Sequence, residues 1–176
     1  MKPGVVAVIG RKKSGKTAII ELLTRELVER GYKIAAVKHI PEPKFTIDQE
    51  GKDTWRFVQA GATTVVSVSE HEIATIERTN TNDISLERIL QKCKDSDLVL
   101  IEGFRDLVSK NNGIAKILIV TSADETAKDL KTFHPAIAFT GIRRPRMAKT
   151  NIPFVNSRRN PKKLADLVEN TVLNRI

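Results

Sequence analysis

The chain has 176 residues, a hydrophobic content of 40% and a formal net charge of +9. Its length and apolar content are enough for a single domain with a buried core, which we expect over residues 1–176. The one cysteine, Cys93, excludes a disulfide framework and a multi-cysteine metal site, and no apolar run approaches the ~20 residues that a membrane span requires. We therefore expect a soluble, cytoplasmic protein that does not enter a membrane.

The first predicted element is a strand over residues 5–9, which are all apolar and so indicate burial on both faces. A helix with apolar residues at helical spacing is predicted over 18–30, before Gly31. Between them stands Gly10-Arg11-Lys12-Lys13-Ser14-Gly15-Lys16-Thr17, a complete G-x-x-x-x-G-K-[ST] motif. Because strand, glycine loop and helix follow in the required order, the sequence predicts a phosphate-binding loop, here termed the phosphate loop (residues 10–17).

The phosphate loop predicts that the chain binds a nucleoside di- or triphosphate. Backbone N–H groups of the loop and of the helix start form a concave positive site for phosphate. We expect the Lys16 ammonium to reach the β- and γ-phosphates and the Thr17 hydroxyl to bind Mg²⁺. The residues expected to contact nucleotide are Gly10, Lys12, Lys13, Ser14, Gly15, Lys16, Thr17 and Ala18.

Strand-like and helix-like segments alternate along the rest of the chain, which favours an α/β fold with a mostly parallel sheet. Two neighbouring segments, 63–68 and 72–78, are separated by a short polar turn and predict an antiparallel hairpin carried by the sheet. The fold class we expect is a three-layer P-loop NTPase domain. The remaining predicted strands are 33–38, 98–101, 116–120, 136–139 and 153–155, and the remaining predicted helices are 53–60, 84–94 and a final one opened by Asn160-Pro161.

Polar residues at the carboxyl ends of the predicted strands are candidates for the site, because ligands bind there in parallel sheets. Glu102 follows the apolar strand 98–101, and this is the form of a second nucleotide motif whose carboxylate holds Mg²⁺ directly or through water. A buried strand that simply ends in a surface acid is the alternative. Lys38 and His39 end the second strand, and His39 could orient a phosphate or a group of a partner.

The segment 39–53 lacks periodicity and predicts a long loop. Asp48 and Asp53 flank Gly51 there, and they could hold Mg²⁺-bound water or respond to the γ-phosphate as switch loops do. We assign Asp48 to the metal, and Asp53 to catalysis with Lys16 and Glu102. The alternative for Asp53 is a helix N-cap.

Five segments occur in a distinctive order. They are residues 10–17, Val37-Lys38-His39, Asp48-x-x-Gly51-Lys52-Asp53-Thr54, Gln59-Ala60-Gly61-Ala62 and Ile101-Glu102-Gly103-Phe104-Arg105. Together they resemble the molybdopterin-guanine dinucleotide biosynthesis protein B family across about the first two-thirds of the chain. The resemblance implies a P-loop GTP-binding protein, usually a homodimer with slow GTP hydrolysis, that assists the enzyme attaching GMP to molybdopterin. Ala18 departs from the family, whose members usually have a second threonine there.

Guanine specificity rests on this resemblance, because the N-K-x-D element that commonly reads guanine is absent. Asp124, after the strand 116–120, could meet the guanine edge, and the loops 140–143 and 156–157 are equally good candidates. Arg143, Arg144 and Arg146 follow another strand, and we hypothesise that they hold anionic molybdopterin or its guanylyltransferase partner. The alternative for this cluster is a solvated turn.

Two other functional classes stay open. A nucleotide or small-molecule kinase uses the same loop, and the arginines at 143–146 could then form its lid. A nucleic-acid-binding NTPase would explain the net positive charge. Nucleic acid is the less favoured partner, because aromatic residues make up only 5% of the chain and are not interleaved with the basic clusters.

Overall fold

The computed structural model describes residues 2–43, 45–144 and 150–174. These residues form two compact units, one made of Met1–His39 and Leu86–Ile176 and the other of Ile40–Ser85. We term them the sheet unit and the hairpin unit and describe each by itself. The expectation of a single domain over the whole chain stays a prediction.

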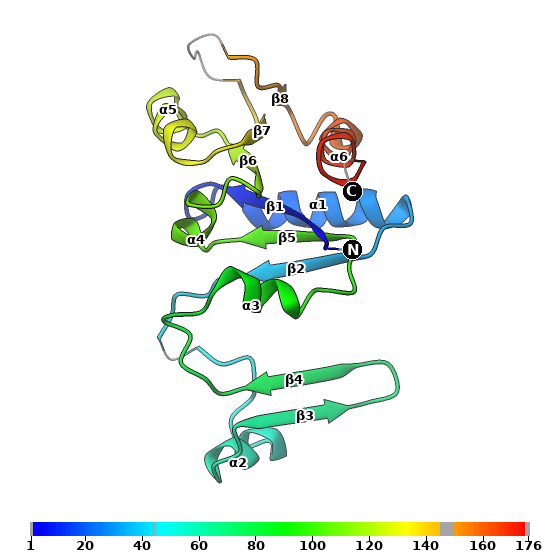
Figure 1. Ribbon diagram of the computed structural model, residues 1–176, viewed down its shortest axis with the longest axis vertical. Coiled ribbons are helices and arrows are strands. Elements are labelled where there is room, and N and C mark those ends of the chain that lie inside the picture. Colours follow the sequence, from blue (N-terminus) through cyan, green and yellow to red (C-terminus); the bar gives the residue numbers. More distant parts are fainter. Residues whose placement is uncertain (1, 44, 145–149, 175–176) are drawn as a thin grey trace. The chain divides into compact units, whose positions relative to one another are not determined.

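The sheet unit is built on six strands in the order β2-β5-β1-β6-β7-β8, and every pairing between them is parallel (Figure 1). The strand order changes direction at β1, so the loop that follows β1 lies at the crevice where parallel sheets bind ligands. The strands are β1 (Gly4–Ile9), β2 (Ile34–Lys38), β5 (Leu98–Glu102), β6 (Ala115–Ile119), β7 (Ala136–Thr140) and β8 (Phe154–Val155).

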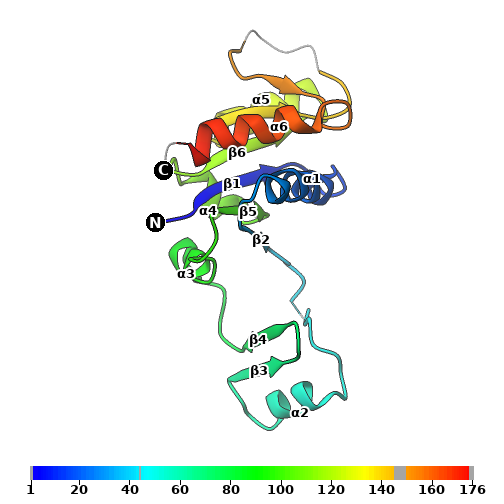
Figure 2. The same cartoon turned by 90° about the vertical axis from the view of Figure 1, so that its right-hand side faces the viewer.

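Helices cover both faces of this sheet, and each face has its own apolar core. Alternate residues of β1 pack into the two cores. Val6 and Val8 belong to the apolar cluster that includes residues of α1 (Lys16–Glu29) and α6 (Pro161–Val168). Ala7 and Ile9 belong to the opposite cluster. That cluster includes residues of α3 (Leu86–Gln91), α4 (Arg105–Ser109) and α5 (Ala123–Thr132). α1 and α6 lie side by side (Figure 2), and a π-helical segment, Glu169–Leu173, extends α6.

The continuous apolar runs behave as the sequence predicts. Val6 to Ile9 are at most 1% exposed, and Leu98 to Ile101 are fully buried. The predicted α/β fold class is confirmed. Two helices, α4 and α5, were not predicted. The α5 segment has few apolar residues, and its start is fixed by a local signal, the Ser122 side chain that accepts a hydrogen bond from the Glu125 N–H.

The hairpin unit holds α2 (Asp53–Gln59), β3 (Thr64–Val68) and β4 (Ile73–Glu77). The predicted hairpin is confirmed, but the expectation that the main sheet carries it is wrong: β3 and β4 form a separate two-stranded sheet. The reason is that β2 and β5, the strands on either side of it in sequence, pair directly with each other. Asp53 is not the N-cap of α2, because Lys52 holds that position and Asp53 is the first helical residue.

No helix in the described part of the chain has the length and apolar character needed to cross a membrane.

Lys116 is a fully buried lysine and the second residue of β6. Its ammonium nitrogen donates to the backbone carbonyls of Asn111, at 2.6 Å, and of His134. Burial lowers the pKa of Lys116 below its ordinary value of 10.5, because desolvation penalises the charged form. A neutral amine still has two N–H donors for the two carbonyls, so deprotonation leaves both hydrogen bonds possible.

The lowered pKa of Lys116 predicts that the free energy of unfolding increases as the solution becomes alkaline. Between the folded pKa of Lys116 and 10.5 the unfolded state binds more protons, so the free energy of unfolding increases with pH. Denaturant unfolding of the protein and of Lys116→Met, from neutral pH upward, measures this effect. The rise should disappear in Lys116→Met and persist in the exposed-residue control Lys131→Met, and an unchanged slope in Lys116→Met would contradict the account.

Candidate functional site

The phosphate loop leads directly from β1 into α1, as its motif requires. Gly15 is the N-cap of α1 with φ of 93°, a left-handed conformation that favours glycine. α1 has no side-chain cap and no acidic residue in its first turn, so its own side chains do not compensate the positive helix end. A Cβ at Gly10 would lie 2.4 Å from the Ser14 Oγ, and this explains the first glycine.

The Lys16 side chain forms its hydrogen bond within the phosphate loop. Lys16 Nζ donates to the Arg11 carbonyl at 2.8 Å, and the Ser14 N–H donates to the same carbonyl at 3.2 Å. The Ser14 hydroxyl is buried and has no hydrogen-bond partner among the residues that the structure describes. Buried polar groups are nearly always paired, so this hydroxyl is a group that a ligand could satisfy.

Glu102 lies where the phosphate loop and the end of β2 meet. The register pairs it with Val8 of β1 on one side and with Lys38 of β2 on the other. Its Oε2 accepts a hydrogen bond from Thr17 Oγ1 at 3.0 Å, and its Oε1 lies 3.9 Å from Lys38 Nζ. The fold therefore brings together three residues that the sequence analysis assigned to the site, although they are up to 85 positions apart.

The chain turns sharply directly after Glu102. Gly103 and Phe104 both have positive φ, at 95° and 51°. His39 lies beside this turn. Its backbone N–H donates to the Glu102 carbonyl at 2.8 Å, and its ring stacks on Phe104 with ring centroids 4.6 Å apart. The ring of His39 is thus held at the edge of the site against an aromatic neighbour.

A cavity of about 640 Å³ lies on the other side of the phosphate loop, between α1 and the carboxyl ends of β6, β7 and β8. We term it the β6–β8 cavity. The Thr140 hydroxyl in its wall is fully buried and has no hydrogen-bond partner in the described part of the chain. The lining residues are Ser14, Gly15, Ala18, Ile19, Leu22, Ile119, Val120, Thr121, Thr140, Gly141, Ile142, Arg143, Ser157 and Arg158.

Some of the residues considered for base recognition line this cavity, and others do not. The loop after β7 lines it through Arg143, and Ser157 lines it from beyond β8. Asp124 instead lies exposed in the first turn of α5, where a carboxylate favours the helix N-terminus, and it is not among the lining residues. Arg144 is exposed, and Arg146 lies outside the described residues.

Asp48 and Asp53 belong to the hairpin unit. Asp48 Oδ1 accepts hydrogen bonds from Thr54 Oγ1 at 2.7 Å and from the Gln49 N–H at 3.0 Å, so it holds the entry to α2. The exposed Asp53 pairs with Arg56 at 3.4 Å. The metal role of Asp48 and the catalytic role of Asp53 stay predictions. Within the described residues, no three His, Cys, Asp or Glu side chains are grouped as a metal cluster.

Comparison with known proteins identifies the family. The model of the family described as molybdopterin guanine dinucleotide synthesis protein B, MobB, matches residues 5–140. The chain belongs to the MobB family. The match spans the phosphate loop, Glu102 and β7, and it confirms the resemblance seen in the sequence motifs.

Two MobB relatives are named molybdopterin-guanine dinucleotide biosynthesis adapter protein. The one from Haemophilus influenzae is 33% identical over 117 residues, which are 65% of this chain and 62% of the relative. The one from Escherichia coli is 29% identical over 109 residues, 60% of this chain and 59% of the relative. The chain thus spans about three-fifths of the length of these relatives.

A crystal structure of molybdopterin-guanine biosynthesis protein B has the same fold. It superposes with a TM-score of 0.72 at 24% sequence identity, covering 94% of this chain and 97% of that one. At this level of identity the likeness establishes the fold alone.

The turn after Glu102 gives a stability prediction. A Cβ at Gly103 would lie 2.6 Å from the His39 Cβ, whereas a Cβ at Gly31, with a similar φ of 92°, has nothing within 4 Å. Gly31→Ala should cost about 1 kcal/mol from backbone strain alone. Gly103→Ala should cost about 2–4 kcal/mol, because the clash is added. Denaturant unfolding measures both, and equal losses would show that the close approach to His39 has no energetic effect.

Proposed function

We propose that this chain is a GTP-binding adapter of molybdopterin guanine dinucleotide biosynthesis and that it binds GTP with Mg²⁺ on the phosphate loop. The observation that carries the proposal is the contact between Thr17 and Glu102 beside the start of α1. A loop hydroxyl and a strand-end carboxylate are the two protein oxygens that P-loop proteins use for the metal. The family membership supplies the pathway and the choice of guanine.

Thr17 and Glu102 fit Mg²⁺ by their chemistry, because both offer oxygen, the ligand that this cation prefers. Bound Mg²⁺ would neutralise charge on the β- and γ-phosphates. Lys16 would exchange the Arg11 carbonyl for phosphate oxygens, and Lys38 would add positive charge on the far side of Glu102. The unpaired Ser14 hydroxyl would gain a phosphate partner.

The β6–β8 cavity suits the nucleoside end of the ligand. It begins at Ser14 and Gly15 of the phosphate loop, and its volume of about 640 Å³ lies within the range of small-molecule sites. Its walls combine apolar side chains, such as Ile119 and Ile142, with polar groups that could orient a base. The unpaired hydroxyl of Thr140 is one such group. Arg143 and Arg158 stand in the same wall.

We propose slow GTP hydrolysis, with binding more important to the function than turnover. In the described residues, no glutamine that could position water lines a cavity beside the phosphate loop. Arg11 and Arg105 pair with carboxylates of α5, and neither of them lines the β6–β8 cavity. A site with these parts holds a nucleotide without fully compensating the charge of the transition state.

The partners we propose are molybdopterin or its guanylyltransferase, with the chain acting as a homodimer. Arg143 and Arg144 follow the end of β7, and Arg143 lines the β6–β8 cavity. A guanidinium there could bind an anionic group of a second ligand in a bidentate manner.

The central prediction for this function concerns Lys16. Lys16→Ala should weaken GTP binding by at least about a hundredfold, because charge-assisted hydrogen bonds to phosphate are lost without opening a hole in the core. Calorimetric titration measures the affinity, and circular dichroism checks the fold. The control Lys131→Ala removes an exposed lysine of α5 and should bind GTP as the parent does. Unchanged affinity in Lys16→Ala would refute the assigned site.

A second prediction separates Glu102 from the phosphate contacts. Glu102→Gln keeps the shape of the side chain but removes its charge, so the Mg²⁺ concentration needed for half-maximal GTP binding should rise about tenfold. Affinity measured without Mg²⁺ should change far less. The exposed-residue control Glu87→Gln should titrate with Mg²⁺ like the parent. If Glu102→Gln also does so, Glu102 is only a surface acid.

A further inference from the structure

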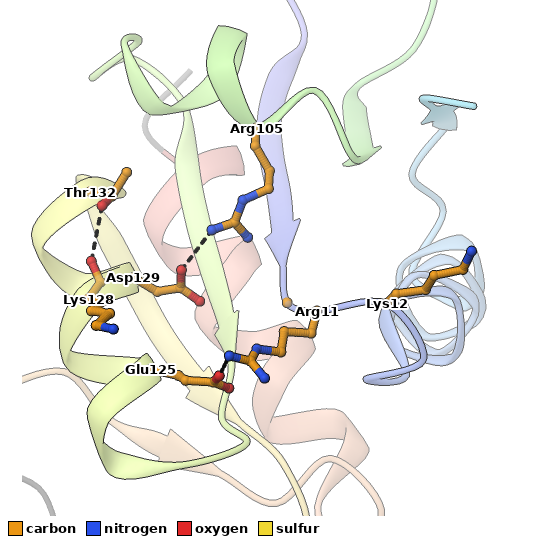
Figure 3. Close-up of a pocket in the computed structure, with 8 residues that line it drawn as sticks. Arg11, Lys12, Arg105, Glu125, Lys128, Asp129 and Thr132 are labelled. Carbon is orange, nitrogen blue, oxygen red and sulfur yellow. Dashed lines mark hydrogen bonds and ion pairs between the residues drawn. The ribbon is translucent and has the colours of Figure 1, made fainter. Parts of the chain in front are cut away.

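A second cavity, of about 450 Å³, adjoins the phosphate loop and is separate from the β6–β8 cavity. We term it the α4–α5 cavity. Only its edge at Gly10, Arg11 and Lys12 belongs to the loop, and its other residues come from α4 and α5 (Figure 3). Those residues are Arg105, Glu125, Lys128, Asp129 and Thr132. None of the five has a part in the proposed nucleotide site.

One face of α5 forms a wall of this cavity. Glu125, Lys128, Asp129 and Thr132 are spaced three, four and seven positions along the helix, and this spacing places them on the same side. Figure 3 shows the Arg11 and Arg105 side chains extending toward this face, from the phosphate loop and from the start of α4. Guanidinium groups from two separate segments therefore reach the same helix.

Both guanidinium groups are held in place by carboxylates, yet each keeps free donors. Arg11 pairs with Glu125, and Arg105 Nη2 lies 2.8 Å from Asp129 Oδ1. Each ion pair uses one Nη2 atom, whereas a guanidinium has five N–H donors. The Arg105 guanidinium also stacks over the Phe133 ring, 4.6 Å from its centroid. The carboxylates thus orient the two guanidinium groups and leave other N–H groups for a ligand.

The net positive charge of the side chains that line this cavity favours an anionic ligand. Arg11, Arg105 and Lys128 line the cavity with only two carboxylates, so the lining has an excess of positive charge. The Lys12 side chain extends away from α5 (Figure 3). Lys128 makes no ion pair with any residue that the structure describes, although its neighbours on α5 do. The Arg11 and Arg105 side chains are 71% and 50% exposed, so their ion pairs are weak and compatible with an incoming anion.

We propose that the α4–α5 cavity is a second binding site, which takes a small phosphate monoester next to the nucleotide. Arg105 and Arg11 hold the phosphate through the N–H groups that the carboxylates leave free, since guanidinium forks match phosphate geometry. Lys128 supplies further charge from α5. The volume suits a small phosphorylated molecule. The site goes beyond the proposed nucleotide site and uses it only as a neighbour.

The test uses inorganic phosphate as the probe and the Lys16→Ala protein, in which the phosphate loop should no longer compete for it. Phosphate is titrated into nitrogen-15-labelled protein, and the backbone amides of residues 125–132 and the Arg105 Nε–H are followed by NMR. We expect saturable shifts at these groups. Arg105→Gln with Lys128→Gln should weaken phosphate binding about tenfold. The matched control Lys110→Gln with Lys131→Gln removes the same charge from the C-cap of α4 and from α5, and it should change little.

Shifts confined to residues 10–17, or an equal loss in the matched control, would overturn the proposal. Lys128→Gln alone should weaken phosphate binding measurably without disturbing the Arg105–Asp129 pair, so the test stands even if the double variant folds poorly. GTP affinity of the cavity variants in the parent protein should stay within a few-fold of the parent value. A parent that binds no GTP but shows the phosphate shifts would refute the proposed function and keep this site.

Discussion

The parallel pairing of β1 with β5 is the constraint on which the site depends. Its register sets Val8 opposite Glu102, and β1 continues from there into the phosphate loop. The pairing of β5 with β2 then fixes Lys38 on the other side of Glu102. Three chemical groups from distant parts of the sequence are therefore brought together by backbone hydrogen bonds of parallel strands, and no loop has to order itself to assemble them.

The sequence was most informative where one residue type has one physical role. The phosphate loop was predicted because glycine, lysine and threonine stand at fixed positions between an apolar strand and a helix. Glu102 was placed because four apolar residues before it indicate a buried strand, and an acid directly after such a strand reaches the ligand edge. These inferences need only local pattern and the rule that parallel strands present their carboxyl ends together.

What the sequence did not reveal depends on pairing between distant segments. The hairpin pattern predicts β3 and β4, but it carries no information on which strands they join. Because β2 pairs directly with β5, the hairpin is not inserted between these two strands of the main sheet. The α4–α5 cavity was also missed. Its arginines looked like parts of the phosphate loop and of the segment after Glu102. Only the packing of α5, a helix with few apolar residues, brings Glu125 and Asp129 to them.

The phosphate loop and Glu102 are proposed to bind Mg²⁺ and a guanine nucleotide together. Calorimetry on the unmodified protein, comparing GTP, GDP and ATP with and without Mg²⁺, tests this proposal most directly. GTP should bind more tightly than ATP, and Mg²⁺ should strengthen GTP binding more than GDP binding, because the metal would neutralise the additional charge of the γ-phosphate. Equal affinity for all three nucleotides, or binding that Mg²⁺ does not change, would contradict it.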